Sequence, residues 1–263
     1  MPAAAVPLFA RYSTADGPRV GVRQDGGWQR WDRAPWEDGR PSGGFDPDDA
    51  VRLLPPVTPT KIVCVGLNYE AHEKESLTVV KGARPATEPL LFLKPPSAVI
   101  AAGDPIRYPA GVTRLDPEAE LAVVIARRAS AVSESDAMAH VAGLTAFNDV
   151  SARNYQQQDG QWARAKGFDT FAPLGPWIAV GLDPSDLGVE CRVNGVRRQT
   201  GRTRDLRYRV PWLVHFISGI MTLEPGDVIA TGTPAGIAPV EPGDVIEVEV
   251  EGVGVLMNRV EGS

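Results

Sequence analysis

Short apolar runs separated by glycine and proline turns predict a chain built mainly from strands. The run from Lys61 to Val65 is almost wholly apolar and ends at Gly66, as a buried strand does. Farther along, Val248 and Val250 alternate with glutamates, which predicts a half-exposed strand that turns at 252–254 and pairs with VLMNRV. The chain contains 27 glycines and 24 prolines, and turn pairs recur through its second half. This texture favours many strands and few long helices.

One turn is repeated within the chain. EPGDVI occurs at Glu224 and again at Glu241. In each copy the proline presets one backbone angle and the glycine supplies a positive one, so each copy predicts a tight turn followed by a strand.

Two segments carry helical signals. SESDAMAHVAG offers Ser133 as an N-cap with Asp136 three residues later, and we expect a peripheral helix there. RVPWLVHFISGIM places Pro211 in a first turn, and we expect this helix to pack on the core. The face that we expect to be buried comprises Trp212, Phe216, Ile217 and Ile220.

The first 57 residues differ in texture from the rest. They hold short strand candidates (LFARYST, RVGVRQDG and GWQRWDR) and a tail rich in proline, glycine and aspartate. We expect a small N-terminal β domain and linker over residues 1–57, with a structural role, and a main domain over residues 58–263.

Composition and charge narrow the class of protein. Hydrophobic residues make up 43% and charged residues 23%, as in a folded globular protein. The net charge is −6 with no basic stripe, so nucleic acid is not an expected partner. No run reaches the ~18 to 20 apolar residues of a membrane span, and no signal segment is evident, so we expect a cytoplasmic protein without a membrane partner.

The cysteines and histidines restrict the metal chemistry. Cys64 and Cys191 lie far apart in strand-like segments and indicate neither a disulfide nor a zinc motif. Only three histidines occur, and they too are widely separated. Any bound metal is therefore expected to have oxygen ligands.

Two carboxylates interrupt the start of a buried strand. Glu118 and Glu120 precede LAVVI, and residues at i and i+2 of a strand share a face. Asp149 ends another strand-like run and is a third candidate ligand. Three carboxylates suit a hard cation such as Mg²⁺ with positions left for substrate oxygens. The spacing alone is also compatible with a solvated strand end.

Other polar residues follow these carboxylates. Arg153 and Gln156 are three apart on a short predicted helix, and Lys166, one of five lysines, lies in a loop rich in glycine and aromatic residues. That lysine is either an exposed stem or a fixed cation for a carboxylate or an enolate. The loop TGTPAG, residues 231–236, has hydroxyls and backbone amides able to hold an anion.

A histidine and a glutamate share a helical turn. His72 and Glu75 are spaced i, i+3, so the carboxylate can orient the imidazole as a general base. A surface helix is the simpler interpretation, and we assign it to the rival pair Asp136 and His140. After His72, the stretch LTVVKGARPATEP is expected to form a mobile lid.

Taken in order, six motifs resemble the fumarylacetoacetate hydrolase family: GLNYEAHEKE, PLLFLKPPSAVI, DPEAELAVVIARR, FNDVSARNYQ, KGFDTFAPLGPW and LEPGDVIATGTPAG. The resemblance covers about residues 60–260. It implies a mainly β fold with few helices (α+β), a mixed β-roll or distorted barrel of the family's C-terminal type with the small N-terminal β unit added, and a homodimer. It also implies that Mg²⁺ or Mn²⁺ binds to Glu118, Glu120 and Asp149.

The resemblance assigns further roles. The catalytic dyad would be His72 and Glu75, Lys166 would assist catalysis, and the substrate contacts would be Arg153, Gln156 and Thr233. The implied activity is hydrolysis of a carbon–carbon bond in acylpyruvate-like substrates, or isomerisation of 2-hydroxy-diene-dioates such as 2-hydroxyhepta-2,4-diene-1,7-dioate, as in aromatic-compound catabolism. The partner would be a small 2-oxo acid or dicarboxylate.

Two alternatives stay open. One is an oxaloacetate-type decarboxylase or lyase that uses the same site, and the other is a non-catalytic scaffold that binds dicarboxylates. The sequence also departs from the family pattern in NYQQQ, residues 154–158, and at Gly167 after the lysine. Both departures could line the pocket and bear on the choice of substrate.

Overall fold

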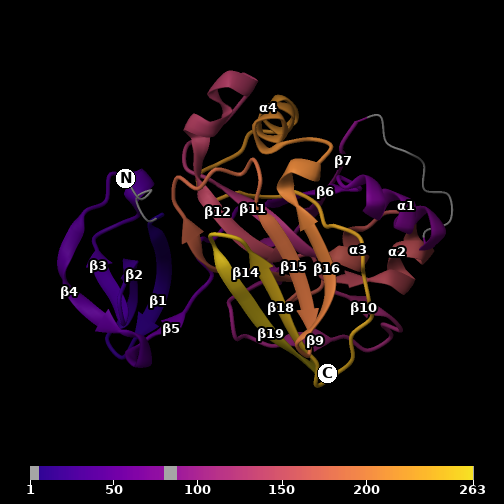
Figure 1. The fold of residues 1–263 in the computed structure, drawn as a ribbon, viewed down its shortest axis with the longest axis horizontal. Helices are drawn as coiled ribbons and strands as arrows, with labels where there is room; N and C mark the ends of the chain where they lie inside the picture. The colour runs from indigo at the N-terminus through magenta and orange to yellow at the C-terminus, as the bar shows by residue number, and fades with distance from the viewer. Residues whose placement is uncertain (1–5, 80–87, 263) are drawn as a thin grey trace.

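A computed structural model describes residues 6–79 and 88–262, and strands dominate it (Figure 1). The largest sheet has twelve strands, of which β5 pairs with β1 and β8 pairs with β14. The order of the other ten is β4 (Pro41–Pro47), β3 (Gly27–Trp31), β2 (Gly17–Gln24), β1 (Leu8–Thr14), β14 (Ala172–Ala179), β12 (Val141–Asn148), β11 (Ala119–Ile125), β17 (Val228–Ala230), β6 (Ile62–Gly66) and β7 (Leu90–Lys94). Because β4 and β7 end this order, the described sheet is open.

Two smaller sheets complete the strand structure. The five-stranded sheet has the order β16 (Val196–Arg202), β15 (Gly188–Val193), β18 (Val245–Val250), β19 (Gly254–Gly262) and β9 (Ile106–Tyr108). A two-stranded sheet joins β10 (Leu115–Asp116) to β13 (Ser151–Ala152), and the short strands of the large sheet are β5 (Arg52–Leu53) and β8 (Val99–Ile100).

The central strand β11 is buried on both faces. Leu121, Val123 and Ile125 join the core between the large and five-stranded sheets, which also takes in side chains of β15 and β18. Ala122 and Val124 point to the opposite face and pack with residues of β6 and β17. A strand covered on both sides explains the continuous apolar run in the sequence.

Helices are few, and most are short. The α-helices are α1 (Glu70–Val79), α2 (Arg153–Asp159), α3 (Ala163–Lys166) and α4 (Val210–Ile220). The 3₁₀ turns are η1 (Pro35–Glu37), η2 (Asp48–Ala50), η3 (Pro96–Ala98), η4 (Glu134–His140) and η5 (Thr203–Asp205). The helix expected after Ser133 is thus the 3₁₀ turn η4, and the Ser133 hydroxyl accepts from the Asp136 amide as an N-cap.

The face of α4 matches the prediction in part. Its buried residues are Val210, Leu213, Val214, Ile217 and Ser218, whereas Ile220 is 57% exposed. Trp212 and Phe216 are half-buried and pack against the core; their rings stack on each other with centroids 4.8 Å apart, and Trp212 also stacks on Tyr208. The helix packs on the core as expected, and Ile220, in its last turn, is the one residue of the predicted face that is exposed.

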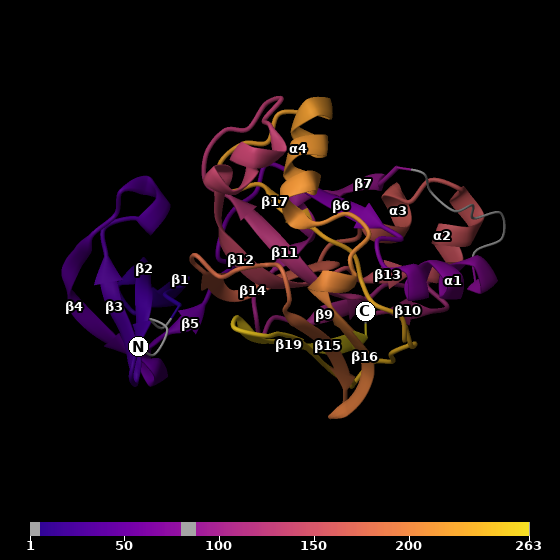
Figure 2. The same ribbon diagram turned by 45° about the horizontal axis from the view of Figure 1, so that its top comes forward.

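The N-terminal strands form a separate lobe beside the main body, as both ribbon views show (Figures 1 and 2). Strand β1 links the lobe to the large sheet because Leu8 pairs with Ala179 and Phe9 pairs with Ile178 of β14. The lobe has its own small core of Ala10, Tyr12 and Trp28, against which Trp177 packs. The division at residue 57 stays a prediction.

The predicted strands and turns otherwise match the structure closely. The chain is mainly β with few helices, as expected, and the two EPGD turns place Gly226 and Gly243 at positive φ before β17 and β18. Cys64 and Cys191 are both free and buried. Among the helices of the described residues, none is long and apolar enough to cross a membrane.

Candidate active site

Three carboxylates converge where β11 begins and β12 ends. Glu118 directly precedes β11 and Glu120 lies within it. The antiparallel register pairs Ala119 with Asn148, so Asp149, the next residue after β12, comes beside Glu118, and its amide donates to the Glu118 carbonyl at 2.9 Å. The side chains of Glu118, Glu120 and Asp149 are buried, and one oxygen from each lies within 4.8 Å of the others.

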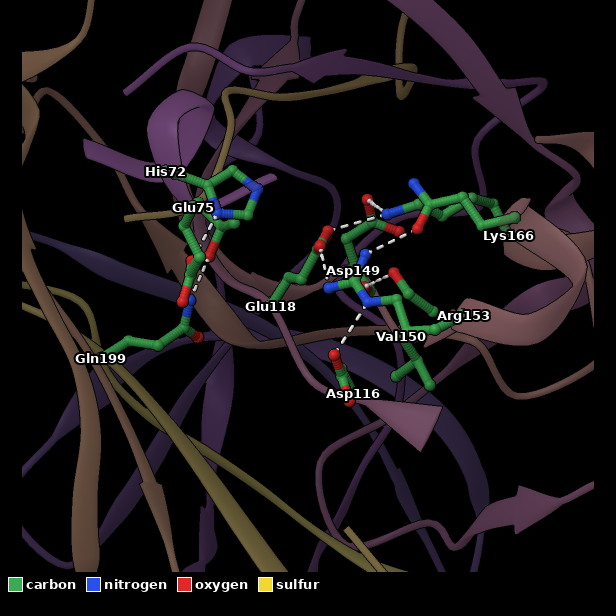
Figure 3. A network of polar contacts seen from close by, with 12 residues as sticks. His72, Glu75, Asp116, Glu118, Asp149, Val150, Arg153, Lys166 and Gln199 are labelled. Atoms are coloured by element: carbon green, nitrogen blue, oxygen red, sulfur yellow. Dashed lines mark hydrogen bonds and ion pairs between the residues drawn. The ribbon is translucent and has the colours of Figure 1, made fainter. Parts of the chain in front are cut away.

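Buried cations surround two of these carboxylates (Figure 3). The ammonium of Lys166, at the end of α3, donates to Glu118 Oε2 at 2.7 Å and to Asp149 Oδ2 at 2.6 Å. From β7, Lys94 donates to Asp149 Oδ1 at 2.5 Å and to the Val150 carbonyl at 3.0 Å. Asp149 is therefore held between two lysines.

Arg153 is the first residue of α2, and its guanidinium is hydrogen-bonded to neighbouring side chains. Its guanidinium donates to Glu118 Oε1 at 2.5 Å, to Asp116 at 2.8 Å and to Gln156 Oε1 at 2.9 Å. Arg153 and Gln156 both line the cavity. The contact of the Arg153 guanidinium with Glu118 orients the Glu118 carboxylate. The role as a substrate contact stays a prediction.

The pKa values of Glu118 and Glu120 are shifted in opposite directions. Burial alone would raise the pKa of Glu118, but Arg153 and Lys166 hold that pKa well below its usual range. The pKa of Glu120 is raised well above its usual range by burial and by the charges of Asp149 and Glu118. The charge on this second glutamate is therefore the uncompensated one.

The contacts of Glu120 fit a metal ligand. Its Oε2 accepts the Gly232 amide at 2.7 Å, and within the described part of the chain no Lys or Arg forms an ion pair with it. A buried carboxylate is costly unless a cation or a proton compensates it. Three carboxylates with this deficit match the hard oxygen ligands that Mg²⁺ and Mn²⁺ accept, so the donor set suits a divalent ion.

The loop at residues 231–236 binds a carboxylate of the protein itself, that of Glu120. Gly232 donates to Glu120, and the Thr233 hydroxyl donates to the Ala119 carbonyl at 2.9 Å. Gln199 of β16 completes this clamp because it accepts from the Ala119 amide at 2.9 Å and donates to Thr233 Oγ1 at 2.8 Å. The loop thereby fixes the strand that carries both glutamates.

His72 and Glu75 form a hydrogen-bonded pair on α1. His72 Nδ1 lies 3.1 Å from Glu75 Oε2, and the same carboxylate accepts the Gly236 amide at 3.2 Å. A carboxylate at Nδ1 favours the tautomer with a lone pair at Nε2. His140, the rival histidine, instead lies 3.4 Å from the Arg127 carbonyl. Residues 80–87 of the predicted lid lie outside the described residues.

One cavity brings the predicted residues together. Its lining includes His72, Glu118, Glu120, Asp149, Arg153, Gln156, Lys166 and Thr233, with Phe92 and Trp162 among the apolar walls. Glu75 orients His72 from behind. In Figure 3 this dyad lies on one side of Glu118 and Lys166 on the other.

Sequence reasoning missed Lys94, Gln199 and Asp116. A lysine that follows four apolar residues in LLFLKPP was a usable signal, because a charge at the end of a buried strand needs a partner. Gln199 stands among arginines on an edge strand, and only the three-dimensional pairing reveals its role.

Two family models match the chain. The model for the fumarylacetoacetate (FAA) hydrolase C-terminal domain matches residues 61–261, and the Rv2993c-like N-terminal model matches residues 8–56. A curated relative, the mitochondrial oxaloacetate tautomerase FAHD2B of Bos taurus, is 41% identical over 227 residues, which cover 81% of this chain and 71% of the relative.

Solved structures resemble the whole chain. The 2-hydroxyhepta-2,4-diene-1,7-dioate isomerase from Mycobacterium marinum is 39% identical with a TM-score of 0.89, over 98% of this chain and 99% of that chain. Maleylpyruvate hydrolase from Sphingobium sp. SYK-6, solved with manganese(II) and pyruvate, is 30% identical with a TM-score of 0.79, over 97% and 99% of the two chains. These matches, and the family model that spans most of the chain, show that the protein belongs to the fumarylacetoacetate hydrolase family of enzymes.

Proposed function

We propose that this protein is a divalent-metal-dependent enzyme that interconverts keto and enol forms of a 2-oxo acid, as an isomerase or tautomerase. The observation that carries the proposal is the buried set of three carboxylates, of which Glu120 lacks a cationic partner among the described residues. Relatives named as an isomerase, a tautomerase and a hydrolase support the substrate class, because each name refers to a small organic acid.

Glu118, Glu120 and Asp149 would hold Mg²⁺ or Mn²⁺, which supplies Lewis-acid stabilisation of negative charge on the oxygens of a 2-oxo acid. Arg153 keeps Glu118 ionised and oriented. Phe92 and Trp162 close the apolar side of the cavity and restrict water there.

The protein's own groups move the proton. His72, with Nδ1 held by Glu75, is the base that takes a proton from the carbon beside the keto group and returns it at the other end of the enol. Lys166 provides a buried ammonium toward the oxygen where charge develops. These roles need no water molecule.

Carbon–carbon hydrolysis of an acylpyruvate is the second candidate. The observation in its favour is again the dyad, because an imidazole oriented by a carboxylate can also deprotonate water. The variant His72→Ala distinguishes hydrolysis from decarboxylation. Hydrolysis should be lost in this variant, whereas a decarboxylase forms the enolate without a base-activated water and should keep its activity. Aromatic-compound catabolism, a homodimer and a cytoplasmic location stay predictions.

The test uses purified protein with the enol form of oxaloacetate, 2-hydroxyhepta-2,4-diene-1,7-dioate and acetylpyruvate. Ultraviolet absorbance follows all three, with Mg²⁺, with Mn²⁺ and after EDTA. We expect metal-dependent isomerisation that falls by about 10²–10³-fold in Lys166→Met, typical of a lost electrostatic contact. Absence of turnover on all three, or rates indifferent to EDTA, rejects the proposal.

A further inference from the structure

Lys94 is a buried lysine that contacts a proposed metal ligand from outside the cavity. It ends β7, is 1% exposed, and places its ammonium 2.5 Å from Asp149 Oδ1 and 3.0 Å from the Val150 carbonyl. Lys166 contacts the other oxygen of the same carboxylate, and Lys166 lines the cavity whereas Lys94 is not among its described lining residues. The two lysines thus approach Asp149 from different sides.

The charge of the site explains why two lysines are present. Three ionised carboxylates carry three negative charges, and a divalent ion neutralises only two of them. A centre with one net negative charge would repel a 2-oxo acid, whose carboxylate is negative at neutral pH. Arg153 divides its guanidinium between Glu118 and Asp116, so the lysines supply most of the remaining positive charge.

We propose that Lys94 is a positioning residue that selects anionic ligands: it holds Asp149 from behind and keeps the metal-loaded centre positive without touching the substrate. This inference rests on the proposed function and deepens it, because it assigns the preference for carboxylate-bearing ligands to a residue outside the cavity.

The proposal predicts opposite effects on two affinities. A buried positive charge repels a divalent cation and attracts an anion, so its removal favours the metal and disfavours the anion. A merely structural lysine would behave differently, because loss of its packing would weaken both affinities together. The two measurements therefore separate an electrostatic role from a structural one.

The experiment uses Lys94→Met, which keeps the apolar stem and removes the charge. Calorimetry measures the Kd of Mn²⁺ alone, and then the Kd of oxalate with the protein saturated in Mn²⁺. We expect an Mn²⁺ affinity equal to or tighter than that of the wild type, and oxalate binding weaker by at least tenfold. Oxalate affinity within threefold of the wild type, or a joint loss of both affinities, overturns the inference.

Lys61→Met is the matched control, because Lys61 also forms an ion pair with a buried aspartate, Asp227, in a turn beside β17. Both affinities should stay within twofold of the wild type in this variant. A loss of oxalate affinity here as large as in Lys94→Met would show a general effect of lysine removal and overturn the inference.

A second variant guards against misfolding, since Lys94→Met leaves the Asp149 carboxylate and the Val150 carbonyl without a hydrogen-bond donor. Lys94→Gln removes the positive charge but keeps an amide that can donate a hydrogen bond. With Mn²⁺ at saturation, we again expect oxalate binding at least tenfold weaker than in the wild type and Mn²⁺ binding no weaker. Oxalate affinity within threefold of the wild type in Lys94→Gln overturns the inference, whether or not Lys94→Met folds.

The outcome is separable from that of the proposed function. A wild-type protein that binds Mn²⁺ and oxalate but turns over none of the 2-oxo acids contradicts the proposed reaction alone. The inference on Lys94 then still stands or falls on the oxalate measurements.

Discussion

At the scale of single residues, Glu120 sets how the metal-free protein responds to pH. Its pKa in the folded protein is raised above the ordinary value of 4.5, by burial first and then by Asp149 and Glu118. For a carboxyl with a raised pKa, the folded state binds more protons than the unfolded state, so stability is greatest below 4.5 and falls as the pH rises through the folded value.

Glu120→Gln should remove this pH dependence and the response to metal together. Without metal, we expect the variant to gain stability relative to the wild type as the pH rises above 4.5, because the uncompensated charge is absent. Mn²⁺ at a hundredfold excess over Kd should stabilise the wild type by about 2.7 kcal/mol and the variant hardly at all. Urea denaturation from pH 5 to 8 measures both effects.

Glu261→Gln is the control. Glu261 is exposed and is not among the described lining residues of the cavity, and the substitution changes the net charge by the same amount as Glu120→Gln. Its stability should follow the wild type at every pH and respond normally to Mn²⁺. A Glu120→Gln protein that Mn²⁺ stabilises as strongly as the wild type would remove Glu120 from the ligand set.

Gly232 is a second residue on which the site depends. Its φ is +105°, its amide holds Glu120, and an added Cβ would lie 2.8 Å from the Asn68 Cβ and 3.1 Å from the Val65 carbonyl oxygen. Gly243 has a similar φ of +102° but open space around it. The pair separates backbone strain from overlap.

We expect Gly243→Ala to cost about 1–2 kcal/mol from the left-handed backbone alone. Gly232→Ala should cost about 1–3 kcal/mol more, as typical of overpacking, and should also weaken Mn²⁺ binding because the loop carries the Glu120 contact. Chemical denaturation and calorimetry test this. Equal stability losses and unchanged Mn²⁺ affinity in both variants would contradict it.

At the scale of elements, the two EPGD turns share a geometry but differ in burial. In each turn the aspartate accepts the amide of the glutamate three residues earlier at 2.8 Å. Asp227 also accepts from the Thr60 amide and hydroxyl and from the Lys61 amide and ammonium, and it is fully buried. Asp227 therefore ties β17 to the start of the parallel strand β6.

Asp227→Asn should destabilise the protein by about 3 kcal/mol at neutral pH, as breaking a buried ion pair does. Asp244→Asn should cost less than about 1 kcal/mol because Asp244 is only half-buried. Urea denaturation measures both.

The pH dependence gives an independent check. Burial alone would raise the pKa of Asp227, but Lys61 and the backbone amides lower it below 3.8. The stability that Asp227 contributes is therefore present above pH 3.8 and is lost as the pH falls through the folded value, so the gap between wild type and Asp227→Asn should narrow in acid. A gap that widens in acid would contradict this assignment.

Local patterns predicted β11 and its two glutamates correctly because strand periodicity is a local property. The same reasoning could not place Lys94 or Gln199, since their partners lie 55 and 80 residues away along the chain. The predicted face of α4 was correct for Ile217, which lies in the core, and for Trp212 and Phe216, which pack against it, and it was wrong only for Ile220 at the end of the helix. Residue types and spacing singled out the candidate site residues, and the family resemblance assigned a role to each.

At the scale of the whole molecule, the contacts of the N-terminal lobe determine whether it unfolds separately from the main body or together with it. Its core is small and packs on the main body through Trp28 and Trp177, with ring centroids 5.7 Å apart, and β1 pairs with β14. Trp36 also packs against the core of the main body, and Arg52 forms an ion pair with Asp104. The site lies in the main body, where both core clusters of β11 meet. Nothing in these contacts connects Trp28 directly to the described cavity residues.

Trp28→Ala should therefore unfold the lobe and leave the metal site intact. Loss of a buried tryptophan costs about 3–5 kcal/mol, which is large for a core of three residues. We expect calorimetry to show a separate early transition and proteolysis to cut before about residue 57, while Mn²⁺ affinity stays near that of the wild type. Trp31→Ala, on the same strand but half-buried, should melt as the wild type does. If Trp28→Ala instead shows one transition at a lower temperature with weakened Mn²⁺ binding, the lobe and the catalytic body form a single cooperative unit, and the predicted boundary at residue 57 does not separate two domains.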